Sequence, residues 1–146
     1  MKSPERYVYV DHAATAPLDA RVLEAMRPYQ TNVYGNPGSF HAKGKAALDA
    51  IQVARAFVAD VLQVRPDEVL FTGSGTESDN LAILGVARSA KKQGQHLVTT
   101  SIEHHAVLEA MQHLARKEEF ELTVVDVEQN GIVDPAKVLD AIREDN

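Results

Sequence analysis

Apolar residues follow two patterns along this chain, one with helical spacing and one of short β-prone runs. The helical spacing predicts five helices, which begin near residues 19, 40, 75, 105 and 135. The β-prone runs predict strands at residues 7–10, 69–72, 96–100 and 122–126. From residue 69 onward strand and helix alternate, which favours parallel strands joined by right-handed crossovers. We therefore predict an α/β fold, a parallel-rich sheet with flanking helices.

Helix boundaries are predicted from proline, glycine and small polar residues. Pro28 should end or bend the first helix, and Ser39 can cap the second, which should end before Pro66. Gly94 should close the third helix. Asp134 precedes a proline and should cap the last helix.

Composition narrows the class of protein. The chain has 146 residues, of which 45% are hydrophobic and 25% charged, so it can bury a core. Its net charge of -6 argues against nucleic acid and anionic membrane surfaces as partners. No apolar run is long enough to span a membrane, and no cysteine is present. We expect a cytoplasmic protein.

The loop at residues 72–80 is the first candidate for chemistry. Gly73 and Gly75 let the backbone turn tightly, and the loop leads from a predicted strand into a helix N-terminus, where phosphate binds well. Ser74, Thr76 and Ser78 add hydroxyl donors. The P-loop and dinucleotide motifs do not fit. Anion binding is favoured, and a well-capped turn is the alternative.

A histidine pair follows the next predicted strand at the same sheet edge. His104 or His105 could stack on a planar cofactor or transfer a proton, or could simply cap the following helix. Only one of the two should face the site. We predict no metal site, because the spacing matches no metal motif. The remaining histidines should be surface or locally hydrogen-bonded residues, and they are His12, His41, His96 and His113.

The loop at residues 34–41 needs an unusual backbone path. Asn36 precedes a proline and is therefore pushed towards an extended conformation. His41 lies at the end of the same loop. Such loops often shape functional sites, but a loop that only connects two helices could have the same sequence pattern.

Four blocks of the chain together resemble the cysteine desulfurase family, within the class V aminotransferase group of pyridoxal-phosphate enzymes. The blocks are Tyr-Val-Asp-His-Ala-Ala-Thr-Ala-Pro (9–17), Gly-Asn-Pro-Gly-Ser-Phe-His-Ala-Lys-Gly (35–44), Phe-Thr-Gly-Ser-Gly-Thr-Glu-Ser-Asp-Asn-Leu-Ala-Ile (71–83) and Thr-Ser-Ile-Glu-His-His-Ala-Val-Leu (100–108). They run in family order and cover nearly the whole chain.

The resemblance implies roles for matched residues. Gly75 and Thr76 would bind the phosphate of pyridoxal phosphate, and His104 would stack on its ring and assist proton transfer. Asn36 and His41 would belong to a loop near the substrate or the subunit interface. Such enzymes are homodimers that remove sulfur from L-cysteine, giving alanine and an enzyme persulfide that passes to a sulfur-acceptor protein, as in iron–sulfur cluster assembly.

The resemblance also implies that the chain is incomplete. Residues 1–17 would lead into the fold, and residues 18–146 would form the front part of the large domain of a fold-type I pyridoxal-phosphate enzyme. The cofactor-binding lysine and the nucleophilic cysteine would lie beyond Asn146, so we expect this chain alone to be inactive. Two alternatives stay open: another class V enzyme, such as an aminotransferase or selenocysteine lyase, and a catalytically silent association fragment.

Overall fold

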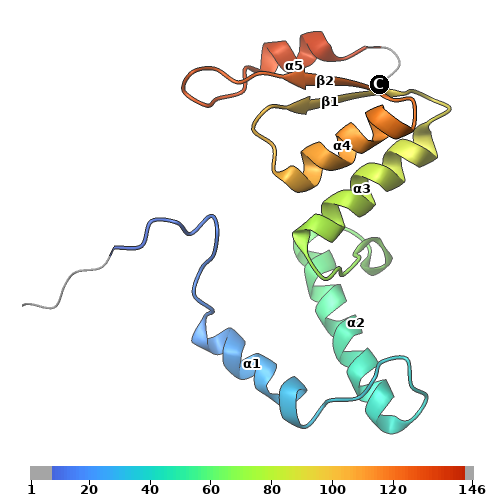
Figure 1. Ribbon diagram of the computed structural model, residues 1–146. Coiled ribbons are helices and arrows are strands. Elements are labelled where there is room, and N and C mark those ends of the chain that lie inside the picture. Colours follow the sequence, from blue (N-terminus) through green and yellow to red (C-terminus); the bar gives the residue numbers. More distant parts are fainter. Residues whose placement is uncertain (1–7, 144–146) are drawn as a thin grey trace, which may run out of the picture. The chain divides into compact units, whose positions relative to one another are not determined.

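The protein is described here by a computed structural model that covers residues 8–143 and divides into two compact units between Leu70 and Phe71 (Figure 1). The first unit is helical, and the second contains a parallel strand pair with helices beside it. Within the described range, no helix combines the length and the apolar character needed to cross a membrane.

Two long helices and one short helix make up the first unit. They are α1 (Ala20–Thr31), α2 (Ala42–Leu62) and the 3-10 helix η1 (Pro66–Glu68). The Asp19 carboxylate caps α1 by accepting a 2.8 Å hydrogen bond from the Arg21 N–H. At the end of α2, Gln63 adopts a left-handed conformation with φ of 55°. The predicted end of this helix before Pro66 is confirmed.

Of the two outcomes expected at Pro28, an end or a bend of the helix, the structure excludes the end, and the predicted Ser39 cap is wrong. Pro28 does not end α1, because a proline removes only one backbone donor and the helix continues to Thr31, where the Asn32 N–H closes it on the Pro28 carbonyl at 2.8 Å. Ser39 does not cap α2. The cap is His41, whose Nδ1 accepts a 3.2 Å hydrogen bond from the Gly44 N–H.

The predicted strand at residues 7–10 does not form where the structure describes it. Tyr7 lies outside the described residues, and residues 8–10 have no regular structure. Instead, the Tyr9 hydroxyl donates to the carbonyls of Asp11 at 2.8 Å and Thr15 at 3.3 Å. These bonds organise a local turn, whereas a strand needs a paired neighbour.

The second unit alternates helix and strand. Its elements are α3 (Gly75–Ala90), β1 (His96–Thr100), α4 (His105–Lys117), β2 (Glu121–Val125) and α5 (Pro135–Ala141). The strands β1 and β2 are parallel and pair from His96 opposite Glu121 to Thr100 opposite Val125. The helices α4 and α5 lie on opposite sides of the strand pair in Figure 1. The predicted α/β class is confirmed.

The core of the second unit lies where α3, α4 and the strands meet. Leu114 of α4 is completely buried, and Phe120 and Ala87 lie beside it. Partly buried side chains from α3 and β1 complete this cluster, and they are Ile83, Leu84 and Leu97. Burial of aromatic and branched side chains is the main stabilising contribution at such a site. This core holds α3 against α4.

The structure differs from the prediction at residues 69–72 and at the end of the third helix. Residues 69–72 form no strand: Leu70 and Phe71 are exposed, and the sheet of the described residues consists of β1 and β2. The third helix ends at Ala90, four residues before Gly94, in a turn that the Gly94 N–H closes on the Ala90 carbonyl. For His96, which was expected to be either a surface or a locally hydrogen-bonded residue, the structure excludes the surface position. Only 4% of this residue is exposed, and its Nε2 lies 2.7 Å from the Thr123 hydroxyl on the neighbouring strand.

Candidate functional site

The loop before α3 is held in shape by its own side chains. Ser74 is the cap residue, and its hydroxyl oxygen accepts a 3.2 Å hydrogen bond from the Glu77 N–H. The Glu77 carboxylate reaches back and accepts a 2.7 Å bond from the Gly73 N–H. The Thr72 and Ser78 hydroxyls lie 2.6 Å apart. This reciprocal pattern fixes the entry into the helix before any ligand binds.

Gly75 and Thr76 form the open part of this turn. They are the first two residues of α3, both are exposed, and no described residue accepts a hydrogen bond from either N–H. No heavy atom lies within 4 Å of the point where a Cβ of Gly75 would stand. Two free N–H groups at the positive end of a helix, next to open space, suit an anionic group.

Contrary to our expectation, not all three hydroxyl groups of the loop are available to a ligand. Ser78 donates within the loop, to the Ser74 carbonyl, at 3.3 Å. Ser74 is engaged as the helix cap. Thr76 is therefore the hydroxyl of the three that has no partner in the described part of the chain. The expectation of three hydroxyls turned towards a ligand is too generous, because the loop uses two of them to hold its own backbone.

His104 stands at the start of the neighbouring helix α4. It is the cap residue, and its Nδ1 accepts a 3.0 Å hydrogen bond from the Ala106 N–H. A ring nitrogen that accepts a hydrogen bond carries no proton, so the neutral ring has its proton on Nε2. The ring of His105 lies edge-on to it, with 6.3 Å between the centroids. Capping and a role at the site are compatible, because capping uses only one ring nitrogen.

One side chain that sequence reasoning did not single out connects the two helix starts. The Asn80 amide nitrogen donates to the Thr76 carbonyl at 2.9 Å and to the Ala106 carbonyl at 3.4 Å. Thr76 and His104 are thereby linked within the second unit. The signal in the sequence was the spacing of four residues between Thr76 and Asn80, which places both on one face of a helix.

The loop with Asn36 and His41 belongs to the first unit. The Asn36 side chain accepts a 2.8 Å hydrogen bond from the Gly38 N–H, and the Asn36 carbonyl accepts a 3.0 Å bond from the Ser39 N–H. Gly44 is buried beneath this turn. Both predicted loop residues thus have defined local partners, which give the loop a preformed shape.

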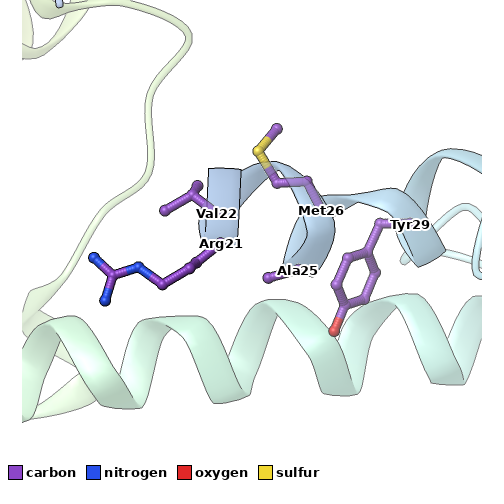
Figure 2. Close-up of a pocket in the computed structure, with 5 residues that line it drawn as sticks. All are labelled: Arg21, Val22, Ala25, Met26 and Tyr29. Carbon is purple, nitrogen blue, oxygen red and sulfur yellow. The ribbon is translucent and has the colours of Figure 1, made fainter. Parts of the chain in front are cut away.

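An apolar hollow on α1 is a different kind of surface. It is lined from that helix alone, as Figure 2 shows, by Arg21, Val22, Ala25, Met26 and Tyr29. Its one cation is Arg21, whose guanidinium pairs with the Asp19 carboxylate at 2.8 Å. The hollow therefore offers little to an anion. Across residues 8–143, no three or more histidine, cysteine or acidic side chains are grouped as a metal site would require.

Comparison with known proteins identifies the class. Residues 8–146 match the family described as aminotransferase class-V, so the chain belongs to that family. Cysteine desulfurase IscS of Dictyoglomus turgidum is 44% identical over 141 residues, which are 97% of this chain and 36% of that protein. Cysteine desulfurase IscS of Neisseria gonorrhoeae is 48% identical over 139 residues, 94% of this chain and 34% of that protein.

Solved structures give the same result for the fold. A NifS-like protein superposes with a TM-score of 0.85 at 40% identity and covers 94% of this chain, which corresponds to 38% of that structure. SspA in complex with cysteine superposes with a TM-score of 0.82 at 38% identity, again over 94% of this chain and 39% of that one. The chain thus has the fold of the front part of such proteins, and it spans about a third of the length of the curated relatives.

Proposed function

We propose that this chain is the N-terminal, cofactor-binding portion of a pyridoxal-phosphate-dependent cysteine desulfurase, which removes sulfur from L-cysteine. The support is the match to proteins named cysteine desulfurase at 44% and 48% identity and to a structure solved with cysteine. Because the chain spans about a third of those relatives, the activity belongs to the full-length protein. The homodimer, the sulfur-acceptor protein and the cytoplasmic location remain predictions.

The residues at the start of α3 fit the phosphate of pyridoxal phosphate. The observation that carries this proposal is the pair of free N–H groups of Gly75 and Thr76 beside an open space and an unpaired hydroxyl. Backbone N–H groups at a helix N-terminus bind phosphate without a lysine. The carboxylate of Glu77 is held by the Gly73 N–H, from which it accepts a 2.7 Å hydrogen bond.

His104 is the residue proposed to act on the ring side of the cofactor. When bound, pyridoxal phosphate would supply an electron sink for negative charge that develops on the substrate. His104 is exposed, so its ring face is accessible, and its Nε2 carries a proton because Nδ1 is engaged with the Ala106 N–H. The side chain can therefore stack on a planar ring and hold a proton at Nε2 at the same time.

The loop with Asn36 and His41 is proposed to contribute to the substrate site or the subunit contact. Its support is its defined shape. The side chains of Asn36 and His41 each accept a hydrogen bond from a backbone N–H two or three residues ahead. Preformed loops carry binding residues at a low entropic cost.

Another class V enzyme is the second candidate, because the family match by itself does not distinguish the members. The residues that follow Asn146 in the gene discriminate between the two. A downstream lysine together with a later cysteine loop favours a desulfurase, and a lysine without that cysteine favours an aminotransferase.

The cofactor assignment is tested with Thr76→Ala in the full-length protein. Loss of the hydroxyl should weaken retention of pyridoxal phosphate about tenfold, as expected for one hydrogen bond to a charged group. Retention is measured by absorbance after dialysis. Thr31→Ala is the matched control, because that hydroxyl bonds only to the Arg27 carbonyl of its own helix. Equal retention in Thr76→Ala and wild type would contradict the phosphate role.

A further inference from the structure

The side chain of Asn80 joins the two helix starts on which the proposed site depends. Its amide nitrogen lies 2.9 Å from the Thr76 carbonyl oxygen in α3 and 3.4 Å from the Ala106 carbonyl oxygen in α4. Asn80 is half-buried between these helices. Resting on the proposed function, we propose that Asn80 is a positioning residue that sets the spacing between the phosphate-binding turn and His104.

The hydrogen bonds form a continuous path between the two turns. The carbonyl oxygen of Ala106 accepts from Asn80, and the backbone N–H of the same residue donates to Nδ1 of His104 at 3.0 Å. On the other side, the Thr76 carbonyl belongs to the first turn of α3, which carries the free N–H groups. Asn80 thus connects the ring of His104 to the phosphate turn through one intervening residue, Ala106.

Neither bond from Asn80 is needed to form a helix. The carbonyls of Thr76 and Ala106 each lie in a first helical turn, where the N–H group four residues ahead satisfies them. A carbonyl oxygen has a second lone pair, and the Asn80 amide uses it. The side chain therefore adds an interhelical constraint to helices that the buried core already holds in place.

The chemistry of the position requires an amide. Asparagine presents two N–H donors on one nitrogen, one for the Thr76 carbonyl and one for the Ala106 carbonyl. Aspartate has the same shape but would direct carboxylate oxygens towards two carbonyl oxygens, which repel it. Alanine would remove the constraint and leave the rest of the helix intact.

The test compares the affinities of the full-length protein, freed of cofactor, for pyridoxal phosphate and for pyridoxal, which lacks the phosphate. Both affinities are followed by absorbance titration. Asn80→Ala should weaken both compounds about tenfold, and Asn80→Asp should weaken both at least as much. Thr76→Ala should weaken pyridoxal phosphate alone. Asn130→Asp is the control, because the side-chain oxygen that accepts from the Ile132 N–H is retained there.

The outcomes separate the positioning role from the proposed function. Wild-type affinities in Asn80→Asp, or a lower melting temperature in Asn80→Ala without any change in affinity, would overturn the positioning role. If wild type binds pyridoxal phosphate, Thr76→Ala weakens it and the Asn80 variants do not, the positioning role alone fails. If wild type binds neither compound, the proposed function fails and the role of Asn80 falls with it. Because Asn80→Asp preserves side-chain volume, it serves where the alanine variant does not fold.

Discussion

Two histidines serve as helix caps in this chain. His41 and His104 each cap a helix with Nδ1, where the usual cap is serine, threonine, asparagine or aspartate. A histidine cap uses one ring nitrogen and leaves the other, together with the ring faces, for a ligand. A serine cap such as Ser74 offers less additional surface. The choice of histidine at two of the candidate positions is therefore consistent with sites that need both a defined backbone and a planar side chain.

The ion pair between Arg88 and Glu118 leads to a prediction about pH. Arg88 of α3 donates to both carboxylate oxygens of Glu118, which follows α4, at 2.7 and 3.1 Å. These hydrogen bonds lower the pKa of Glu118, with a smaller contribution from nearby His113 and Lys91. A carboxylate whose pKa is lowered on folding stabilises the fold above its unfolded pKa, and this stability is lost as the pH falls through the folded pKa.

Glu118→Gln should therefore lower the melting temperature at pH 7, and the difference from wild type should shrink below about pH 4. Thermal unfolding monitored by circular dichroism across that range measures the effect. Glu24→Gln is the control, because Glu24 pairs only with Arg27 of its own helix and both side chains are exposed. A difference that stays constant from pH 7 to pH 3 would show that the charge of Glu118 does not contribute.

At the scale of elements, two helices carry loops that differ in how tightly they are packed. The loop at residues 35–44 folds onto the start of α2, where Gly44 is buried. A Cβ at Gly44 would overlap the Ser39 carbonyl oxygen and stand 2.7 Å from that of Asn36. The loop before α3 is open, since Gly75 has free space around it. The closed loop presents a fixed surface, and the open loop leaves room for a ligand.

Gly44→Ala should destabilise the protein by about 1–3 kcal/mol, because the added methyl group displaces backbone rather than a flexible side chain. Gly85→Ala is the matched control within α3. No heavy atom lies within 4 Å of its Cβ position, so alanine should stabilise the helix by about 0.5–1 kcal/mol. Urea unfolding gives both values. A neutral effect of Gly44→Ala would mean that the loop relaxes more readily than its contacts indicate.

At the scale of the whole molecule, the chain carries one side of the proposed site. The candidate phosphate turn and His104 lie together in the second unit. The chain contains no cysteine, and none of its lysines stands in a segment that resembles the lysine motif of the family. The groups that would bind the cofactor covalently and attack the substrate sulfur are thus expected from residues other than these 146.

The 146-residue chain mixed with pyridoxal phosphate, L-cysteine and a thiol reductant should release no sulfide above the background without protein. A full-length cysteine desulfurase in the same assay is the positive control. Methylene blue detection measures the product. Sulfide release that depends on the chain and is abolished by His104→Ala would contradict the view that essential groups lie elsewhere.

Much of the fold was predictable because its signals are local. The C-terminal end of α2 and the start of α5 follow from a few adjacent residues: Asp134 caps α5 by accepting a 2.9 Å bond from the Ala136 N–H, as predicted. The paired strands were also located, since each is a short apolar run. Residues 69–72 also form a short apolar run, but they do not belong to the sheet of the described residues. Composition indicates the capacity to form a strand, and pairing decides whether one forms.

The sequence by itself determined the helices, the glycine loop and the family, because periodicity, capping and motif order depend on residues that are close together in the sequence. Only the tertiary structure decided which groups are free. It shows that Ser78 is used within its loop, that His96 is buried against Thr123, and that Asn80 reaches Ala106 across the gap between α3 and α4. The contacts of His96 with Thr123 and of Asn80 with Ala106 join residues 27 and 26 positions apart. They depend on how helices and strands pack, which no local pattern specifies.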